Sequence, residues 1–97
     1  MAYEIIINKR FTNKLLHVLD YLEKEWGKKV AYEFQDKVFV RIYMLQLNPF
    51  IGAPTGVASV RSTLITKHNR MYYRVKGNKL VILNLYDTRS NYQKKNY

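Results

Sequence analysis

The stretch NRMYYRVKGNKLVILNLYDTR (residues 69–89) decides the fold, because it contains two strands joined by a tight turn. Gly77-Asn78 between two apolar runs is typical of a two-residue hairpin with a type II′ turn. The first run alternates strictly, which places Arg70, Tyr72 and Arg74 on one face of the predicted sheet and the residues between them on the other. We therefore expect one cationic face and one face that fills the core.

The segments before this hairpin complete the predicted sheet. Residues 57–66 are expected to form another strand, which connects to the hairpin through Lys67-His68-Asn69. The Gly- and Pro-rich residues 50–56 indicate a loop. Residues 3–8 are short and β-branched, so the chain is expected to begin with a strand.

Two helices are predicted between the first strand and the loop. Apolar residues recur every three or four positions up to Trp26, with Thr12 as the predicted N-cap and Gly27 at the expected end. A second helical pattern runs over residues 30–45 and stops at Asn48-Pro49. The short connection makes the pair an antiparallel αα-hairpin.

These elements give an α+β fold in the order β-α-α-β-β-β. An N-terminal strand and an antiparallel helical hairpin pack on a small, mainly antiparallel sheet. The length predicts one domain over residues 1–97, and the last eight residues (SNYQKKNY) form a polar tail.

Charge divides the chain into two halves. Residues 1–48 carry eight basic and six acidic side chains, a net charge of +2, whereas residues 49–97 carry nine basic side chains and one acidic, a net charge of +8. Such a field favours an anionic partner. The chain has no cysteine and only two histidines, so we expect no disulfide, metal site or cofactor. We expect no membrane segment and a cytoplasmic location.

The basic half supplies the candidate phosphate-binding residues. Guanidinium groups make planar, bidentate contacts to phosphate, which favours the four arginines of this half. The alternative is that arginine on an uncovered sheet face serves solubility and edge protection. The arginines are Arg61, Arg70, Arg74 and Arg89, and the lysines considered with them for RNA binding are Lys67, Lys94 and Lys95.

Aromatic and histidine side chains lie among these cations. Tyr72 and Tyr92 are the better candidates for stacking on bases, although core or strand packing is the commoner use of tyrosine. His68 precedes Arg70 in a predicted turn and is a candidate for proton transfer, with a solvated polar residue as the alternative. His17 is expected to be a helix-face residue.

A nuclease with one acid in its basic half has only a metal-free mechanism open to it. The RNA 2′-hydroxyl would attack the adjacent phosphate, while the protein orients the nucleotide, neutralises charge and moves protons. Arginine and tyrosine supply much of that chemistry.

The run Asn69 to Val75, the Gly77-Asn78 turn, the apolar strand after it and Asp87-Thr88-Arg89 resemble the RelE/ParE superfamily of toxins from type II toxin–antitoxin systems. The resemblance implies a bacterial cytoplasmic toxin that forms a hetero-oligomer with a cognate antitoxin, whose segments cover the basic surface. One branch of the superfamily cleaves mRNA in the ribosomal A site. The other blocks DNA gyrase without cleaving anything.

The resemblance to the ribonuclease branch assigns catalytic roles by position. Arg70 falls on a phosphate-binding arginine, Arg61 on the first of two basic residues in the preceding strand, and Arg89 near a basic residue after the last strand. Tyr92 corresponds to a late aromatic that orients a base or moves a proton, and His68 can assist from the turn. The expectation is a metal-independent, ribosome-dependent mRNA endoribonuclease, with a gyrase inhibitor or a non-toxic nucleic-acid-binding relative as alternatives.

Overall fold

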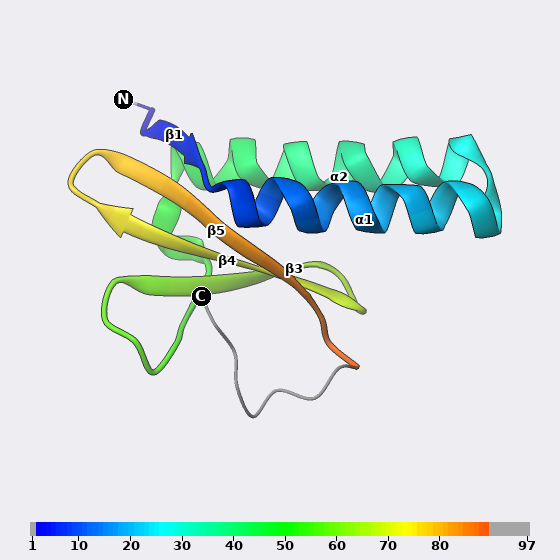
Figure 1. Cartoon of the computed structure of the whole chain (residues 1–97). Coiled ribbons are helices and arrows are strands. Elements are labelled where there is room, and N and C mark those ends of the chain that lie inside the picture. The colour runs from blue at the N-terminus through cyan, green and yellow to red at the C-terminus, as the bar shows by residue number, and fades with distance from the viewer. Residues whose placement is uncertain (1, 90–97) are drawn as a thin grey trace.

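The computed structural model describes residues 2–89 and shows a five-stranded sheet with two helices on one face (Figure 1). In chain order the elements are β1 (Glu4–Ile7), α1 (Lys9–Trp26), α2 (Lys28–Leu47), the 3-10 helix η1 (Pro49–Ile51), β2 (Ala53–Pro54), β3 (Val60–Thr66), β4 (Asn69–Lys76) and β5 (Lys79–Asp87). The strand order is β1-β5-β4-β3-β2, and only β1 and β5 pair in parallel. The predicted α+β fold is confirmed. None of the helices in residues 2–89 combines the length and apolar character that a membrane span needs.

The helical hairpin is confirmed, with one boundary that was predicted wrongly. Gly27 ends α1 with a φ of 95°, a left-handed value that favours glycine, and α2 begins at the next residue. The N-cap is Asn8, not Thr12, because the Asn8 side chain accepts a hydrogen bond from the Arg10 N–H at 2.9 Å. The Thr12 N–H already bonds to the Asn8 carbonyl at 3.2 Å, so Thr12 lies inside the first turn.

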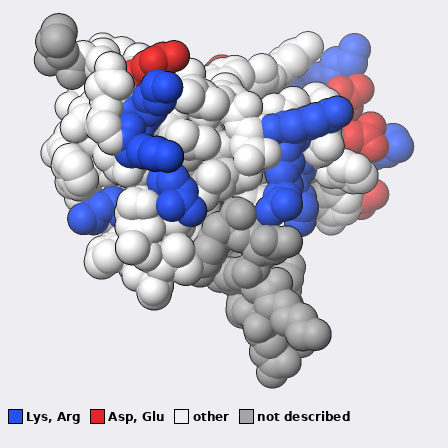
Figure 2. Space-filling view, turned by 60° about the vertical axis from the view of Figure 1, so that its left-hand side comes forward, with Lys and Arg blue, Asp and Glu red and all other residues white. Residues whose placement is uncertain are grey.

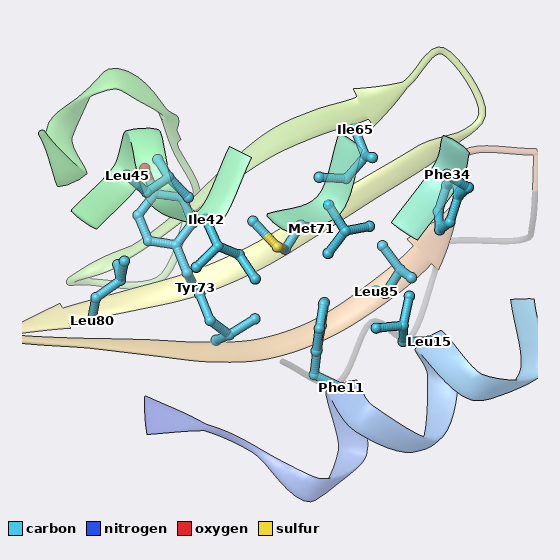
Figure 3. Packing of buried hydrophobic residues seen from close by; sticks show 12 residues of the cluster. Phe11, Leu15, Phe34, Ile42, Leu45, Ile65, Met71, Tyr73, Leu80 and Leu85 are labelled. Atoms are coloured by element: carbon cyan, nitrogen blue, oxygen red, sulfur yellow. The ribbon is translucent and has the colours of Figure 1, made fainter. Parts of the chain in front are cut away.

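The core lies between the helices and one face of the sheet (Figure 3). In β4, Met71 and Tyr73 are fully buried on this face, as the alternation predicts. The helices, β3 and β5 supply the rest, with Phe11, Leu15, Phe34, Val38, Ile42, Leu45, Ile65, Leu80, Ile82 and Leu85 as their buried members. The apolar residues that recur every 3.6 positions in the helices and every second position in the strand therefore pack together in one layer.

The predicted type II′ hairpin is also present. Lys76 pairs with Lys79 across the two turn residues, and Gly77 has a φ of 60°. Asn78 is not among the positive-φ residues of 2–89, which distinguishes a type II′ turn from type I′.

The loop before β3 is more ordered than expected. Residues 50–56 contain part of η1 and the two-residue strand β2, and β3 begins at Val60 instead of residue 57. The Tyr73 hydroxyl holds this loop, because it donates to the Pro49 carbonyl at 2.7 Å and accepts from the Gly52 N–H at 3.0 Å. Burial raises the pKa of the Tyr73 hydroxyl, against the opposing effects of the Gly52 hydrogen bond and the Arg61 charge. The hydroxyl therefore stays protonated and able to donate.

Candidate functional site

Arg70 and Arg74 lie on the helix-free face of the sheet, as the alternation predicts. We call them the sheet-face arginines. An Arg70 guanidinium nitrogen donates to the Ser62 hydroxyl at 2.9 Å, and an Arg74 guanidinium nitrogen donates to the Ser59 hydroxyl at 3.0 Å. Within residues 2–89, no carboxylate lies at ion-pair distance from either one. Both guanidinium groups are thus positioned by neutral hydroxyls and keep their charge unpaired in this part of the chain.

Ser59 holds Arg74 from a strained backbone position. Its φ is 63°, a left-handed value that is uncommon for a residue with a Cβ. Its carbonyl accepts from the Val75 N–H at 3.1 Å, which ties the residue to β4. Neither Ser59 nor Ser62 was predicted as part of the site, because a serine hydroxyl in or beside a strand carries no functional signal until the cross-strand register is known.

Tyr72 lies between the sheet-face arginines but is packed away. Its side chain is 4% exposed, in a second hydrophobic cluster with Val60 and Leu83. Its ring meets that of Tyr86 edge to face, with centroids 5.6 Å apart and planes at 83°. In this arrangement the ring presents no open face to a base. The expected cationic face therefore also carries an apolar cluster. The sequence signal for this cluster is Leu83 in the neighbouring strand β5.

Arg61 points to the other face of the sheet. It pairs with Tyr73, and directly opposed residues share a face, whereas Arg70 pairs with Leu64. Its guanidinium donates to the Gly52 carbonyl at 2.7 Å and lies 5.2 Å from the centre of the Phe50 ring. Arg61 thus fastens the loop before β3, and the structure does not bring it together with Arg70.

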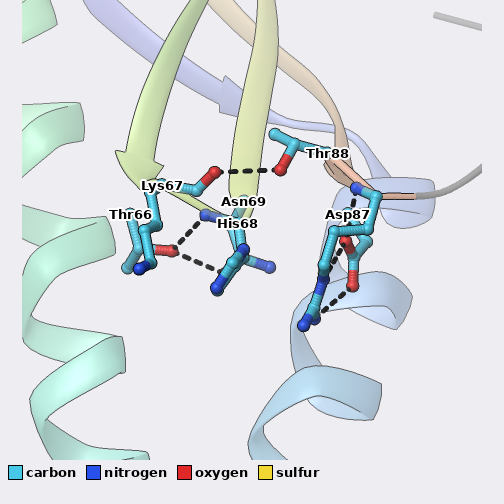
Figure 4. A network of polar contacts seen from close by, with 7 residues as sticks. Thr66, Lys67, His68, Asn69, Asp87 and Thr88 are labelled. Atoms are coloured by element: carbon cyan, nitrogen blue, oxygen red, sulfur yellow. Dashed lines mark hydrogen bonds and ion pairs between the residues drawn. The ribbon is translucent and has the colours of Figure 1, made fainter.

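The β3–β4 turn and the end of β5 form a polar network (Figure 4). The Thr88 N–H donates to the His68 carbonyl at 2.8 Å, and the Thr88 hydroxyl donates to the Lys67 carbonyl at 2.9 Å. The Thr66 hydroxyl accepts from the His68 N–H at 3.2 Å. These contacts fix the backbone of the turn, so Lys67 is presented on a rigid support with its side chain exposed, and His68 is half-buried.

Arg89 is paired with Asp87 at the end of β5. The guanidinium and the carboxylate form an ion pair at 2.8 Å, supported by a second hydrogen bond from Nε at 3.0 Å. The side-chain and backbone hydrogen bonds from Arg89 lower the pKa of Asp87 to about 2. The charge of Arg89 is therefore partly neutralised before any partner binds.

This pair predicts a small, pH-dependent contribution to stability. We expect Asp87→Asn to lower the free energy of unfolding by less than about 1 kcal/mol at pH 7, because both side chains are largely solvated. Since the folded-state pKa is depressed, the contribution is present above the ordinary value of 3.8 and is lost as the pH falls towards 2. Urea unfolding of both proteins at pH 7 and pH 3 measures it.

Asp20→Asn is the matched control, because Asp20 and Lys24 form an ion pair at 3.0 Å with both side chains more exposed. We expect no measurable change there. A difference between Asp87→Asn and the parent chain that grew on acidification would contradict the prediction.

Three predicted site residues, Tyr92, Lys94 and Lys95, lie outside the described residues.

Figure 2 shows Lys and Arg side chains spread over one face of the molecule, with Asp and Glu at its margins. In residues 2–89, no three His, Cys, Asp or Glu side chains come together as a metal ion would require.

The sequence reasoning missed a groove beside the turn. It encloses about 870 Å³ between the ends of α1 and α2 and the β3–β4 turn, and we call it the hairpin groove. Lys14, His17 and Tyr21 line it from α1, at positions three and four residues apart. That spacing on one helix side is the signal that could have found them.

The family model described as the ParE toxin of the type II toxin–antitoxin system parDE matches residues 5–92. A comparison with curated proteins finds no match.

Solved toxin structures have a similar fold. A chain of the chromosomal ParDE TA system from P. aeruginosa aligns with a TM-score of 0.77 and 20% identity, over 89% of this chain and 96% of that one. A chain of the E. coli RelBE toxin–antitoxin complex aligns with a TM-score of 0.60 and 14% identity, over 92% and 100%. A chain of the YoeB dimer structure from Staphylococcus aureus aligns with a TM-score of 0.61 and 12% identity, over 89% of this chain and 97% of that one. At these identities the likeness shows the fold alone.

Proposed function

Because this chain belongs to the ParE toxin family of type II toxin–antitoxin systems, we propose that it arrests growth by binding DNA gyrase and not by cleaving mRNA. The choice between these two activities is our own inference from the geometry of the site. This proposal differs from the expectation from the sequence, in which a ribonuclease came first and a gyrase inhibitor was the alternative.

The separation of Arg61 from Arg70 is the observation that carries this choice. Metal-independent cleavage needs several groups to converge on one phosphate, so that charge in the transition state is neutralised where it develops. Here Arg61 leaves the opposite face of the sheet and is held by the Gly52 carbonyl. Arg89 is held by Asp87, and the Tyr72 ring is packed in a cluster. These placements support binding more than catalysis.

Binding a large protein partner does not require several groups to converge on one phosphate. Two arginines with hydroxyl supports and no carboxylate partner in residues 2–89 are suited to bidentate contacts with acidic side chains. Arginine is also among the residues that dominate the energetics of protein interfaces. The sheet-face arginines are therefore the residues that we assign to target recognition.

A cognate antitoxin is the second partner that we propose. The family match and the similarity to chains of toxin–antitoxin complexes support a hetero-oligomer with such a protein. The net charge of +8 in residues 49–97 favours an acidic antitoxin segment.

The test measures both candidate activities with the same purified chain. We expect it to inhibit ATP-dependent supercoiling of relaxed plasmid by gyrase, while mRNA stays intact and protein synthesis continues in a cell-free translation reaction. Fragmented mRNA in that reaction with normal supercoiling would overturn the proposal in favour of the ribonuclease. Normal readings in both assays would exclude both targets for this chain.

A further inference from the structure

Helix α2 is apolar on the side that faces away from the core as well as on its buried side. Phe39, Tyr43 and Leu47 recur every four residues and so lie on one side of the helix, and Phe50 follows in η1, which packs against α2. These four side chains, which we call the uncharged face, are between 47% and 60% exposed. A helix on a protein surface normally has a polar outer side, so an exposed apolar outer side indicates an interface.

Tyr43, Leu47 and Phe50 belong to the longest charge-free stretch of the chain. The nineteen residues from Ile42 to Val60 contain no charged side chain, although charged residues make up 25% of the sequence. Because the net charge is +10, two copies of the chain repel each other wherever their basic surfaces meet. That repulsion is weakest at the uncharged face.

Two opposite charges lie at the ends of the uncharged face. Asp36 is exposed three residues before Phe39 on the same side of α2, and within residues 2–89 no cation lies at ion-pair distance from its carboxylate. At the other end, the Arg61 guanidinium lies 5.2 Å from the centre of the Phe50 ring and has no carboxylate partner in the same part of the chain. Arg41 does not belong to this face, because it is two residues from Phe39 and two residues turn a helix by about 200°.

We propose that the chain forms a two-fold symmetric dimer through the uncharged face. A two-fold axis across this face brings the same apolar patch of both copies together and sets the two α2 helices antiparallel. Asp36 of each copy then approaches Arg61 of the other copy, and Tyr43, midway in sequence between Asp36 and Phe50, lies beside the axis. An apolar centre rich in aromatic residues with charged groups at its margin is typical of protein interfaces.

A second copy fits this face better than the other classes of partner. A nucleic acid would find one cation, Arg61, and a carboxylate, Asp36, which would repel its phosphates. An acidic protein segment would be attracted to the basic surfaces elsewhere on the chain and not to the uncharged centre. A second copy presents both an apolar centre and the opposite charge at each end. The dimer does not depend on which target the chain inhibits.

Sedimentation equilibrium of the full chain at physiological salt tests the dimer. We expect a monomer–dimer equilibrium with a Kd in the micromolar range. Tyr43→Lys places two like charges beside the axis and is expected to raise this Kd by at least about 100-fold. Tyr21→Lys makes the same change on α1, outside the uncharged face, with a side chain that is 59% exposed compared with 60% for Tyr43. It is expected to change the Kd by less than about threefold.

A second pair of variants tests the charges at the ends of the face. Asp36→Asn removes the carboxylate that approaches Arg61 of the other copy, at both ends of the interface, so we expect the dimer to weaken by about tenfold. Glu33→Gln raises the net charge by the same amount but lies on the lining of the hairpin groove. It is expected to weaken the dimer by less than about threefold.

Cross-linking locates the axis directly, because the chain has no cysteine of its own. Residues beside a two-fold axis meet their own counterparts, so Tyr43→Cys is expected to form a covalent dimer under mild oxidation. Tyr21→Cys is expected to stay monomeric on a denaturing, non-reducing gel. This measurement keeps the inference testable if Tyr43→Lys unfolds the chain, which thermal unfolding of each variant checks.

Three results would overturn the inference: a chain that stays monomeric at high micromolar concentration, equal losses within either matched pair, or as much covalent dimer from Tyr21→Cys as from Tyr43→Cys. A monomeric chain that sediments with vesicles of phosphatidylcholine would identify a lipid surface as the occupant instead. Since these experiments contain neither gyrase nor antitoxin, their failure is distinguishable from failure of the proposed function.

Discussion

Gly52→Ala is expected to lower the free energy of unfolding by about 3 kcal/mol, the largest effect on stability of a single added methyl group that we expect in this chain. A Cβ at Gly52 would overlap the Tyr73 hydroxyl and lie 2.8 Å from the Ser62 carbonyl oxygen. Tyr73 is fully buried and cannot move aside. The loop must shift, which costs overpacking strain and the Gly52–Tyr73 hydrogen bond. Urea unfolding at pH 7 measures the change.

Gly56→Ala is the control, because a Cβ there meets nothing within 4 Å. It is expected to change the stability by less than about 0.5 kcal/mol. Tyr73→Phe removes the hydroxyl that clashes, so Gly52→Ala should cost less in that background than in the parent chain. Simple additivity of the two changes would contradict the contact as the cause.

The fold was predictable because each element repeats one pattern. The helical spacing of Phe34, Val38 and Ile42 and the alternation in β4 both bury one face, so a single period identifies each element. The position of the first helix cap was not predictable in the same way. Asn8 and Thr12 are both good caps, and only the hydrogen bond to Arg10 distinguishes them.

The site was less predictable because it depends on cross-strand register. Thr66 pairs with Asn69, but Leu64 pairs with Arg70, so a bulge skips Ile65. Without that bulge Arg61 would oppose Arg74 and share the face of the sheet-face arginines. One extra residue moves every earlier side chain of β3 to the other face. No residue type in residues 60–66 indicates this bulge, so the grouping of Arg61 with Arg70, which rested on residue type and on the family resemblance, could not be corrected from the sequence.

The hairpin groove escaped prediction for a different reason. Leu15, Leu22 and Trp26 belong to one apolar face by spacing, and spacing alone predicts that all three are covered. Coverage depends on where the sheet ends relative to the helix, which is a property of the packed structure. Trp26 is exposed at the end of α1, because this end of the helix extends past the sheet (Figure 1).

Charge reversal at Arg70 is expected to have the largest effect on function. Arg70→Glu should raise the concentration of chain that halves gyrase supercoiling by at least about 100-fold, or about 2.7 kcal/mol. The new carboxylate would repel the acidic side chains that we expect the arginine to bind. Lys29→Glu makes the same change in net charge on an exposed position of α2 and is expected to have less than about a threefold effect.

Two further variants separate geometry from charge at this position. Arg70→Lys keeps the charge but loses the planar, bidentate contact, so we expect an intermediate loss of about tenfold. Ser62→Ala removes the hydroxyl 2.9 Å from the guanidinium, and we expect a smaller loss because Arg70 remains charged but less well positioned. Thermal unfolding of each variant checks that the fold is kept. Full inhibition by Arg70→Glu would remove Arg70 from the target interface, since no contact of Arg70 with an acidic partner could survive that change.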